Sequence, residues 1–294
     1  MYASKIDKIF NMLIDTHAHI NFKAFAEDSE QTIKRALDQG VWLVNVGTQI
    51  DTSRAAVEMA EKYKEGVYAV IGLHPVHTYS QHLDEEETSF LSREEDFNTS
   101  EYESLAKSPK VVGIGECGLD YYRLPQNDDR ASVIEKQKVA FIVQIKLAKE
   151  ANKALVIHCR PSVGSQDAYI DILKILDEEV RSKKYELRFE IHSFTGSPET
   201  VQEFLKRGAY VGLNGIITFD KTGNMQKVVE AVPLERIVLE TDSPYLTPIP
   251  HRGKRNEPSF VKHVAEKVAE IKKVSINGVS ETTSHNARNL FLLS

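Results

Sequence analysis

The sequence predicts an α/β protein, a (β/α)₈ TIM barrel that forms a single domain over residues 1–294. Eight short runs rich in Val, Ile and Leu recur along the chain, and amphipathic helical patterns separate them. A chain of this length has room for eight such units. The alternative α/β fold is an open doubly wound sheet, which usually carries a Gly-rich phosphate loop after its first strand. Here the first run ends in Asp-Thr-His-Ala-His, which contains no glycine.

The predicted strands are the apolar, β-branched runs. They cover residues 12–16, 41–46, 67–72, 110–116, 154–158, 187–192, 209–214 and 236–241. Helices are expected at 29–39, 52–65, 130–151 and 167–183, where apolar residues return every three or four positions. Ser197 followed by Pro198 is a typical helix start, Asn256 to Pro258 opens another helix, and residues 280–293 form the last.

Composition restricts the class of protein. With 41% hydrophobic and 27% charged residues, the composition is that of a soluble globular protein. No apolar run reaches the roughly 18 residues of a membrane-spanning helix, so no membrane partner is expected. The chain has two cysteines, which excludes a disulfide scaffold and favours a cytoplasmic protein.

Most of the negative charge lies in one segment. Residues 84–103 hold nine acids and one Arg, within an insert at about 81–104, whereas the whole chain has a net charge of −6. We expect this insert to be a solvated loop followed by the start of a helix. The remainder is only slightly positive, and it shows no basic stripe that could coat a long nucleic-acid duplex.

Polar residues end nearly every predicted strand. A (β/α)₈ barrel places its active site at the carboxyl ends of its strands, so these side chains are expected to meet. Asp15, His17 and His19 end the first strand and, being two apart, are expected to share a face. The H-x-H pair alone could be two hydrogen-bonded structural histidines, but the convergence of further residues favours a metal site. These residues are His74, Glu116, His158, His192, Asn214 and Asp242.

The ligand types and their number indicate the metal. Imidazole and carboxylate ligands suit Zn, Mn, Fe or Ni, and Mg less well. Four histidines and two carboxylates exceed what one tetrahedral Zn requires. Two divalent metal ions (Mg, Mn or Zn) that share a carboxylate fit the number better. Such pairs are a common device for hydrolysing phosphate esters.

The alternation of side chains along strands makes further predictions. If Glu116 and His158 face the mouth of the barrel, Cys117 and Cys159 face the helices as buried free thiols. Glu190 and Glu240 share a face with metal-ligand candidates. Each either accepts a hydrogen bond from the second ring nitrogen of a ligand histidine or forms an interior salt bridge with an arginine.

Arginines follow several strands at the same rim. Arg123, Arg160, Arg252 and Arg255 are expected near the mouth of the barrel, where they favour an anionic substrate and are candidates to bind phosphate. Glycines at 113, 115 and 118 match the spacing of a dinucleotide site. However, Glu116 stands where the phosphate would have to approach, which argues against a dinucleotide.

The motifs in combination resemble the TatD family of metal-dependent hydrolases and deoxyribonucleases. The resemblance runs from about residue 12 to the C-terminus and rests on L-I-D-T-H-A-H-I-N (13–21), G-L-H-P-V (72–76), G-E-C-G-L-D-Y (115–121), H-C-R (158–160), H-S-F-T-G (192–196), E-T-D-S-P-Y-L-T-P (240–248) and R-G-K-R-N-E-P (252–258). Asn21 stands where the first motif often has Asp, at a position that is not a ligand in the family pattern.

The resemblance implies a TIM barrel with a binuclear metal centre and assigns roles to the ligand candidates. One ion would be held by His17, His19 and Asp242. The other would be held by His158 and His192, and Glu116 would bridge the two. His74 resembles the family histidine near the substrate phosphate. In catalysis, Asp242 is a candidate to accept the proton of the attacking water.

The expected activity is that of a metal-dependent phosphodiester hydrolase. The resemblance indicates a TatD-type 3′-5′ exodeoxyribonuclease acting on DNA, single-stranded or at 3′ ends. One alternative is an amidohydrolase that cleaves C–N or ester bonds in a small molecule, although Glu116 stands where many such enzymes place a carbamylated Lys. A second alternative is a non-catalytic protein that binds nucleic acid or a protein partner.

Overall fold

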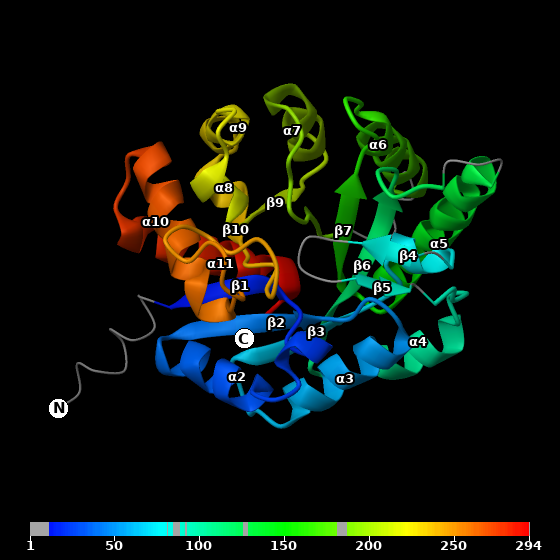
Figure 1. Ribbon diagram of the computed structural model, residues 1–294, viewed down its shortest axis with the longest axis horizontal. Coiled ribbons are helices and arrows are strands. Elements are labelled where there is room, and N and C mark those ends of the chain that lie inside the picture. The colour runs from blue at the N-terminus through cyan, green and yellow to red at the C-terminus, as the bar shows by residue number, and fades with distance from the viewer. Residues whose placement is uncertain are drawn as a thin grey trace.

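Eight parallel strands close into a barrel in the order β1-β10-β9-β8-β7-β6-β3-β2 (Figure 1). The computed structural model describes residues 12–80, 82–84, 89–91, 93–125, 129–180 and 187–293. Helices surround the barrel, so the predicted (β/α)₈ fold is confirmed. The barrel strands are β1 (Leu13–Ala18), β2 (Val41–Val46), β3 (Val67–Ile71), β6 (Val111–Asp120), β7 (Ala154–Arg160), β8 (Phe189–Ile191), β9 (Tyr210–Leu213) and β10 (Ile237–Leu239).

Most of the helices lie between successive strands and pack on the outside of the barrel, whereas the last two helices follow the last strand. They are α2 (Ser29–Asp38), α3 (Ile50–Glu61), α4 (Thr99–Ala106), α5 (Arg130–Glu150), α6 (Asp167–Val180), α7 (Pro198–Leu205), α8 (Ile216–Phe219), α9 (Asn224–Ala231), α10 (Val261–Lys272) and α11 (Ile276–Phe291). In the described residues, 3-10 turns accompany them at Lys23–Phe25, Pro75–Thr78, Leu234–Arg236 and Pro258–Phe260. Among the described helices, none has the length and apolar character that a membrane crossing requires.

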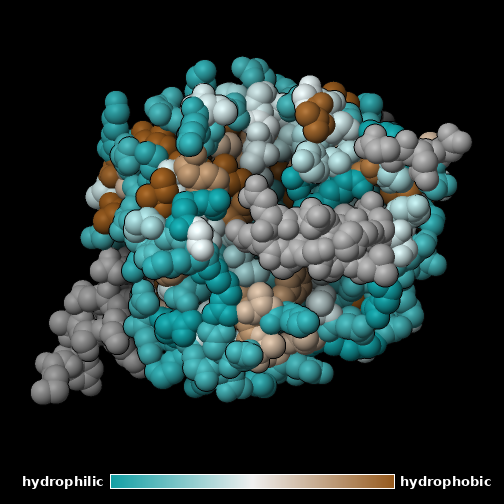
Figure 2. Space-filling model, viewed as in Figure 1, coloured by the Kyte–Doolittle hydropathy of each residue, from teal (hydrophilic) through white to brown (hydrophobic). Residues whose placement is uncertain are grey.

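Apolar side chains fill two layers. The inner layer lies within the barrel and includes Ile14, Val70, Val156 and Val238, with Phe291 from α11 packed among them. The outer layer lies between the strands and the helices, and it contains Cys117 and Cys159. Both thiols are buried and free, as predicted, and burial raises the pKa of each well above its usual range. The surface in Figure 2 is mostly hydrophilic.

The acidic segment contains structure that its composition does not indicate. The short strands β4 (His82–Asp84) and β5 (Ser89–Leu91) pair antiparallel, and α4 begins at Thr99. Glu95 is mostly buried: its Oε1 accepts hydrogen bonds from the Tyr102 hydroxyl at 3.0 Å and from the backbone N–H of Ile50 at 3.2 Å, at the start of α3. The prediction of a helix start is confirmed. The prediction of a solvated loop is wrong for Glu95, because an acid at a helix N-terminus pairs with the helix dipole.

Strand β6 extends beyond the predicted 110–116 to Asp120. Gly115 and Gly118 have φ angles of +147° and +141°, which L side chains rarely adopt. A Cβ atom at Gly118 would lie 2.1 Å from the backbone oxygen of His158 on β7, and one at Gly115 would lie 2.5 Å from that of Val156. These two glycines therefore let β6 approach β7 closely, which explains the glycine spacing without a dinucleotide.

Candidate metal centre

The site begins at the end of β1, where the pairing register with β2 shifts between Asp15 and Ala18. Because of this irregularity, His17 and His19 project into the barrel mouth while Asp15 does not share their face. The Asp15 carboxylate instead accepts hydrogen bonds from the backbone N–H and hydroxyl of Thr241, at 2.8 and 2.6 Å. The expectation of one shared polar face was therefore wrong for Asp15, which ties β1 to the end of β10.

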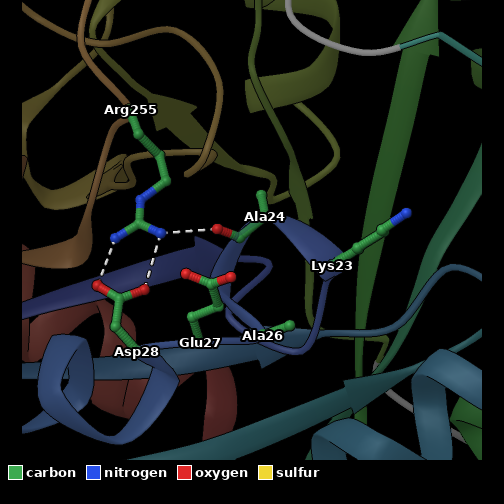
Figure 3. A pocket seen from close by; sticks show the side chains of 6 residues that line it. All are labelled: Lys23, Ala24, Ala26, Glu27, Asp28 and Arg255. Carbon is green, nitrogen blue, oxygen red and sulfur yellow. Dashed lines mark hydrogen bonds and ion pairs between the residues drawn. The ribbon is translucent and has the colours of Figure 1, made fainter.

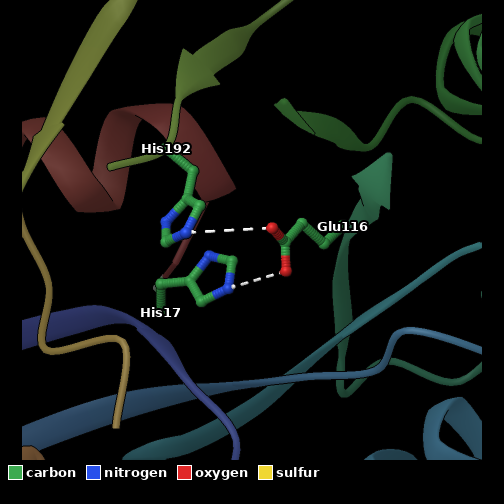
Figure 4. Close-up of side chains that lie close together, drawn as sticks. All are labelled: His17, Glu116 and His192. Carbon is green, nitrogen blue, oxygen red and sulfur yellow. Dashed lines mark ion pairs between the residues drawn. The ribbon is translucent and has the colours of Figure 1, made fainter. Parts of the chain in front are cut away.

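The predicted ligand side chains converge on Glu116. His17 Nε2 lies 3.2 Å from His19 Nε2, and His19 Nε2 lies 3.4 Å from Asp242 Oδ1. His158 Nδ1 lies 2.7 Å from Glu116, and His192 Nε2 lies 3.8 Å from Glu116 and from Asp242. Figure 4 shows Glu116 facing His17 and His192, which reach it from β1 and from the end of β8.

The two oxygens of Glu116 face different histidines. Oε2 lies 3.3 Å from His17 Nε2 and 3.7 Å from His19 Nε2. Oε1 faces the other set: it lies 2.7 Å from His158 Nδ1, 3.4 Å from His74 Nε2 and 3.8 Å from His192 Nε2. One carboxylate therefore offers an oxygen to each of two groups of nitrogens, which is the geometry of a bridging ligand.

The site is buried and its charges are coupled. Burial alone would raise the pKa of Glu116, but electrostatic interaction with the His74 ring and hydrogen bonds from His158 and His17 hold that pKa well below its usual range. Burial would lower the pKa of His192, yet the charge of Glu240 and the hydrogen bond to it raise that pKa to about 10. The site therefore holds an ionised carboxylate among imidazoles.

Three ligand candidates have their second ring nitrogen held by an acceptor. His19 Nδ1 lies 2.9 Å from the backbone oxygen of Val46, and His192 Nδ1 lies 2.9 Å from Glu240 Oε2. His158 Nε2 lies 3.2 Å from Asp120 Oδ2. Such contacts fix the tautomer and the orientation of a metal-binding imidazole. For Glu240, the structure favours the first of the two alternatives, that of an acceptor for a ligand histidine.

Asp120 is the residue of this site that sequence analysis missed. It is fully buried, and it is also held by Arg123, whose Nη1 donates to Asp120 Oδ2 at 2.6 Å. Burial would raise the pKa of Asp120, but the hydrogen bond with His158 and the charge of Arg123 lower it strongly. The sequence could have indicated this role for Asp120, because it lies two residues after Gly118 and four residues after Glu116 on the same strand.

His74 lies beside the cluster with a defined tautomer. Its Nδ1 accepts a hydrogen bond from the backbone N–H of Val76 at 3.1 Å, so the proton of the neutral ring is on Nε2. That Nε2–H points toward Glu116. Burial and the nearby charge of His158 lower the pKa of His74 to about 4, so the ring is neutral at pH 7. In this tautomer His74 is a hydrogen-bond donor.

The four rim arginines differ in their surroundings. Arg123 pairs with Asp120, and Arg255 pairs with Asp28 through two bonds of 2.8 and 2.6 Å beside a cavity of about 550 Å³ (Figure 3). Arg160 lies over the ring of Tyr122 at 3.9 Å. Arg252 lies over the ring of Phe219 at 4.1 Å and donates to the backbone oxygen of Thr247.

The donor set fits divalent metal ions. Within the described ranges, His17, His19 and Asp242 form one group whose ligand atoms lie within 4.8 Å of one another. Glu116 belongs to two more such groups, one with His17 and His192 and one with His74 and His158. Imidazole nitrogens around a shared carboxylate are typical of Zn or Mn sites. Fold and site together define a metal-dependent hydrolase built on a (β/α)₈ barrel.

Comparisons with known proteins identify the family. A family model described as TatD related DNase matches residues 14–292. The metal-dependent hydrolase YabD of Bacillus subtilis (strain 168) is 39% identical over 281 residues, which cover 95% of this chain and 99% of the relative. The protein named 3′-5′ ssDNA/RNA exonuclease TatD from Shigella flexneri serotype 5b (strain 8401) is 30% identical over 95% of this chain and 98% of its own length.

A solved structure agrees with this assignment. The crystal structure of YJJV, a TatD homolog from Escherichia coli K12, superposes with a TM-score of 0.80 at 25% identity, covering 97% of this chain and 100% of that one. The chain belongs to the TatD related DNase family. It is a metal-dependent nuclease of that family, a hydrolase that acts on ester bonds.

Proposed function

We propose that this chain is a 3′-5′ exonuclease that removes nucleotides from single-stranded DNA with two divalent metal ions. The observation that carries the proposal is Glu116, whose two oxygens face separate groups of histidines. Similarity to the relative named 3′-5′ ssDNA/RNA exonuclease TatD supports the substrate and the polarity. The ions would be Mg²⁺, Mn²⁺ or Zn²⁺; His17, His19 and Asp242 would hold one, and His158 and His192 would hold the other.

The metal ions supply a water molecule of lowered pKa and offset the charge of the phosphate. The protein residues orient the reactants around them. Asp242 is poised to accept the proton of the attacking water, because its carboxylate lies at the open side of the cluster with 15% of its side chain exposed. The Nε2–H of His74 donates a hydrogen bond to a phosphate oxygen. Glu116 contacts both groups of histidines, one with each carboxylate oxygen.

The rim arginines have two different roles in this proposal. Arg160 and Arg252 lie on aromatic rings, and this stacking orients their guanidinium groups, which we propose bind phosphate. Arg123 and Arg255 are already paired with Asp120 and Asp28, so each acts on the substrate while also holding its partner acid. Few phosphate contacts suffice for an enzyme that captures one strand end.

The proposal is tested with one single-stranded DNA oligomer labelled in turn at its 3′-terminal and 5′-terminal nucleotide. Each is incubated with Mg²⁺, Mn²⁺, Zn²⁺ or EDTA. We expect metal-dependent release of the 3′ label as a mononucleotide at once, and stepwise shortening of the 5′-labelled strand. Glu116→Ala should abolish both, whereas Glu235→Ala, at an exposed position, should not. Early release of the 5′ label would overturn the polarity, and the absence of any cleavage would overturn the nuclease function.

A further inference from the structure

A buried carboxyl lies within the barrel close to the metal centre. Glu190 is on β8, two residues before His192, opposite Val156 of β7 and Tyr210 of β9. Its side chain is fully buried, and within the described part of the chain neither of its oxygens has a hydrogen-bond partner, because the nearby Thr16 hydroxyl donates to the backbone oxygen of Leu239 instead. A buried carboxyl without a partner is costly, so its presence at this position calls for a function.

The alternative of an interior salt bridge does not account for Glu190. Arg188 donates to the backbone oxygens of Leu290 and Asn152. Arg236 donates to the backbone oxygen of Gly208. Neither guanidinium donates to Glu190, because both Glu190 oxygens are without a partner among the described residues.

His17 has a buried ring nitrogen that lacks a hydrogen-bond acceptor among the described residues. Its Nε2 faces Glu116, His19 and Asp242, so Nε2 is the atom that would bind an ion. Its Nδ1 is buried and has no hydrogen-bond partner in the described ranges. Of the four histidines proposed as ligands, His17 is therefore the one whose second nitrogen lacks an acceptor, since Val46, Asp120 and Glu240 serve the other three.

The unpaired donor and the unpaired acceptor lie close together. A ring nitrogen of His17 and oxygens of Glu190 and Glu240 lie within 4.8 Å of one another. Glu240 is already occupied by His192 at 2.9 Å, by the backbone N–H of Ser193 at 2.8 Å and by the Asn214 amide at 3.1 Å. Glu190 is the acceptor that remains.

We propose that Glu190 is a positioning residue that accepts a hydrogen bond from the Nδ1–H of His17 when His17 Nε2 binds an ion, the two side chains being within 4.8 Å of each other in this structure. This contact fixes the proton on Nδ1 and leaves Nε2 free to bind the ion, as Asp120 and Glu240 do for the other histidines. A carboxyl oxygen accepts in either protonation state, so the contact does not depend on the charge of Glu190. The inference rests on the proposed role of His17 as a metal ligand.

The test measures metal binding rather than cleavage. Co²⁺ alone is titrated into the metal-free full chain, and both its affinity and its visible absorption spectrum are recorded. Glu190→Leu removes the acceptor at similar volume, whereas Glu190→Gln retains one. We expect Glu190→Leu to weaken one Co²⁺ site by about 10- to 100-fold and to alter its spectrum, and Glu190→Gln to restore most of both. Cooperative thermal unfolding of the metal-free variants, at a temperature no lower than that of the wild type, shows that they fold.

A double-mutant cycle shows whether Glu190 acts through His17. In the His17→Ala background, Glu190→Leu should weaken Co²⁺ binding no further. An unchanged Co²⁺ affinity and spectrum in Glu190→Leu would overturn the inference. So would equal defects in Glu190→Gln and Glu190→Leu, or a full further loss in the His17→Ala background. If the wild type binds Co²⁺ as expected but does not cleave DNA, the proposed function fails while this inference stands.

Discussion

The substitution Glu240→Gln should weaken metal binding by reversing the tautomer of His192. Glu240 Oε2 faces His192 Nδ1, while Oε1 accepts from the Ser193 backbone N–H at 2.8 Å and from the Asn214 amide at 3.1 Å. A glutamine has only one oxygen. Directed at Ser193 and Asn214, that oxygen satisfies both donors and places the amide NH₂ against His192 Nδ1. The ring must then carry its proton on Nε2, the nitrogen proposed to bind the ion.

The structure sets the magnitude of this effect. To restore the binding tautomer, the glutamine must flip and leave the donors of Ser193 and Asn214 unpaired. Each buried donor left unpaired costs about 1–3 kcal/mol, so the two cost about 2–6 kcal/mol. The lower limit corresponds to roughly a 30-fold weaker affinity for the ion at His192, since each 1.4 kcal/mol is about tenfold.

The assay is isothermal titration of metal-free protein with Mn²⁺ and with Zn²⁺. The matched control is Glu235→Gln, at an exposed position shortly before β10, which should bind as the wild type does. Thermal unfolding of the metal-free proteins shows whether the Glu240→Gln variant folds. A folded variant whose affinity for both ions lies within threefold of the wild type would refute the tautomer argument.

The remaining predictions concern pH, catalysis and substrate binding. Because the pKa of His192 is raised to about 10 in the metal-free site, binding must displace its proton, so affinity should rise with pH up to about 10. Calorimetry in buffers of different ionisation enthalpy should show this proton release, and pH-independent binding between pH 6 and 8 would contradict it. His74→Ala should lower kcat/KM by about 10²- to 10³-fold as the loss of a hydrogen-bond donor, with metal stoichiometry unchanged. Loss of a metal ion from that variant would instead make His74 a ligand. Tyr122, which is 50% exposed with Arg160 over its ring, is a candidate to stack a base. Tyr122→Ala should raise KM for an oligonucleotide by roughly 5- to 150-fold and leave KM for methyl p-nitrophenyl phosphate unchanged; equal changes for both substrates would refute stacking.

Much of the candidate site could be predicted because a barrel brings the ends of its strands together. The positions of His17, Glu116, His158 and His192 followed from where each apolar run ends, and the structure places their side chains around one point. Strand alternation also placed Cys117 on the outside of the barrel.

Other features depend on contacts that no local pattern encodes. Asp15 does not share the predicted face with His17 and His19 because the pairing register shifts within β1. A shift of one residue reverses the side of the sheet to which the following side chains point. Asp120 lies beyond the predicted end of its strand. Glycines interrupt the apolar pattern of β6, so the sequence did not indicate that the strand continues to Asp120. Glu95 was assigned to solvent because its segment is acidic, whereas the N-terminus of α3 that it pairs with is distant in sequence. The short helices α8 and α9 were not predicted, because helices of four and eight residues are too short to show a long amphipathic pattern.

The central claim is that this cluster holds two divalent ions that share Glu116. Anomalous diffraction from crystals grown with Mn²⁺ tests it most directly. We expect two peaks about 3.5–4 Å apart, one among His17, His19 and Asp242 and the other beside His158 and His192, with Glu116 between them. A single peak that Glu116 does not contact, or no peak at saturating Mn²⁺, would contradict the claim.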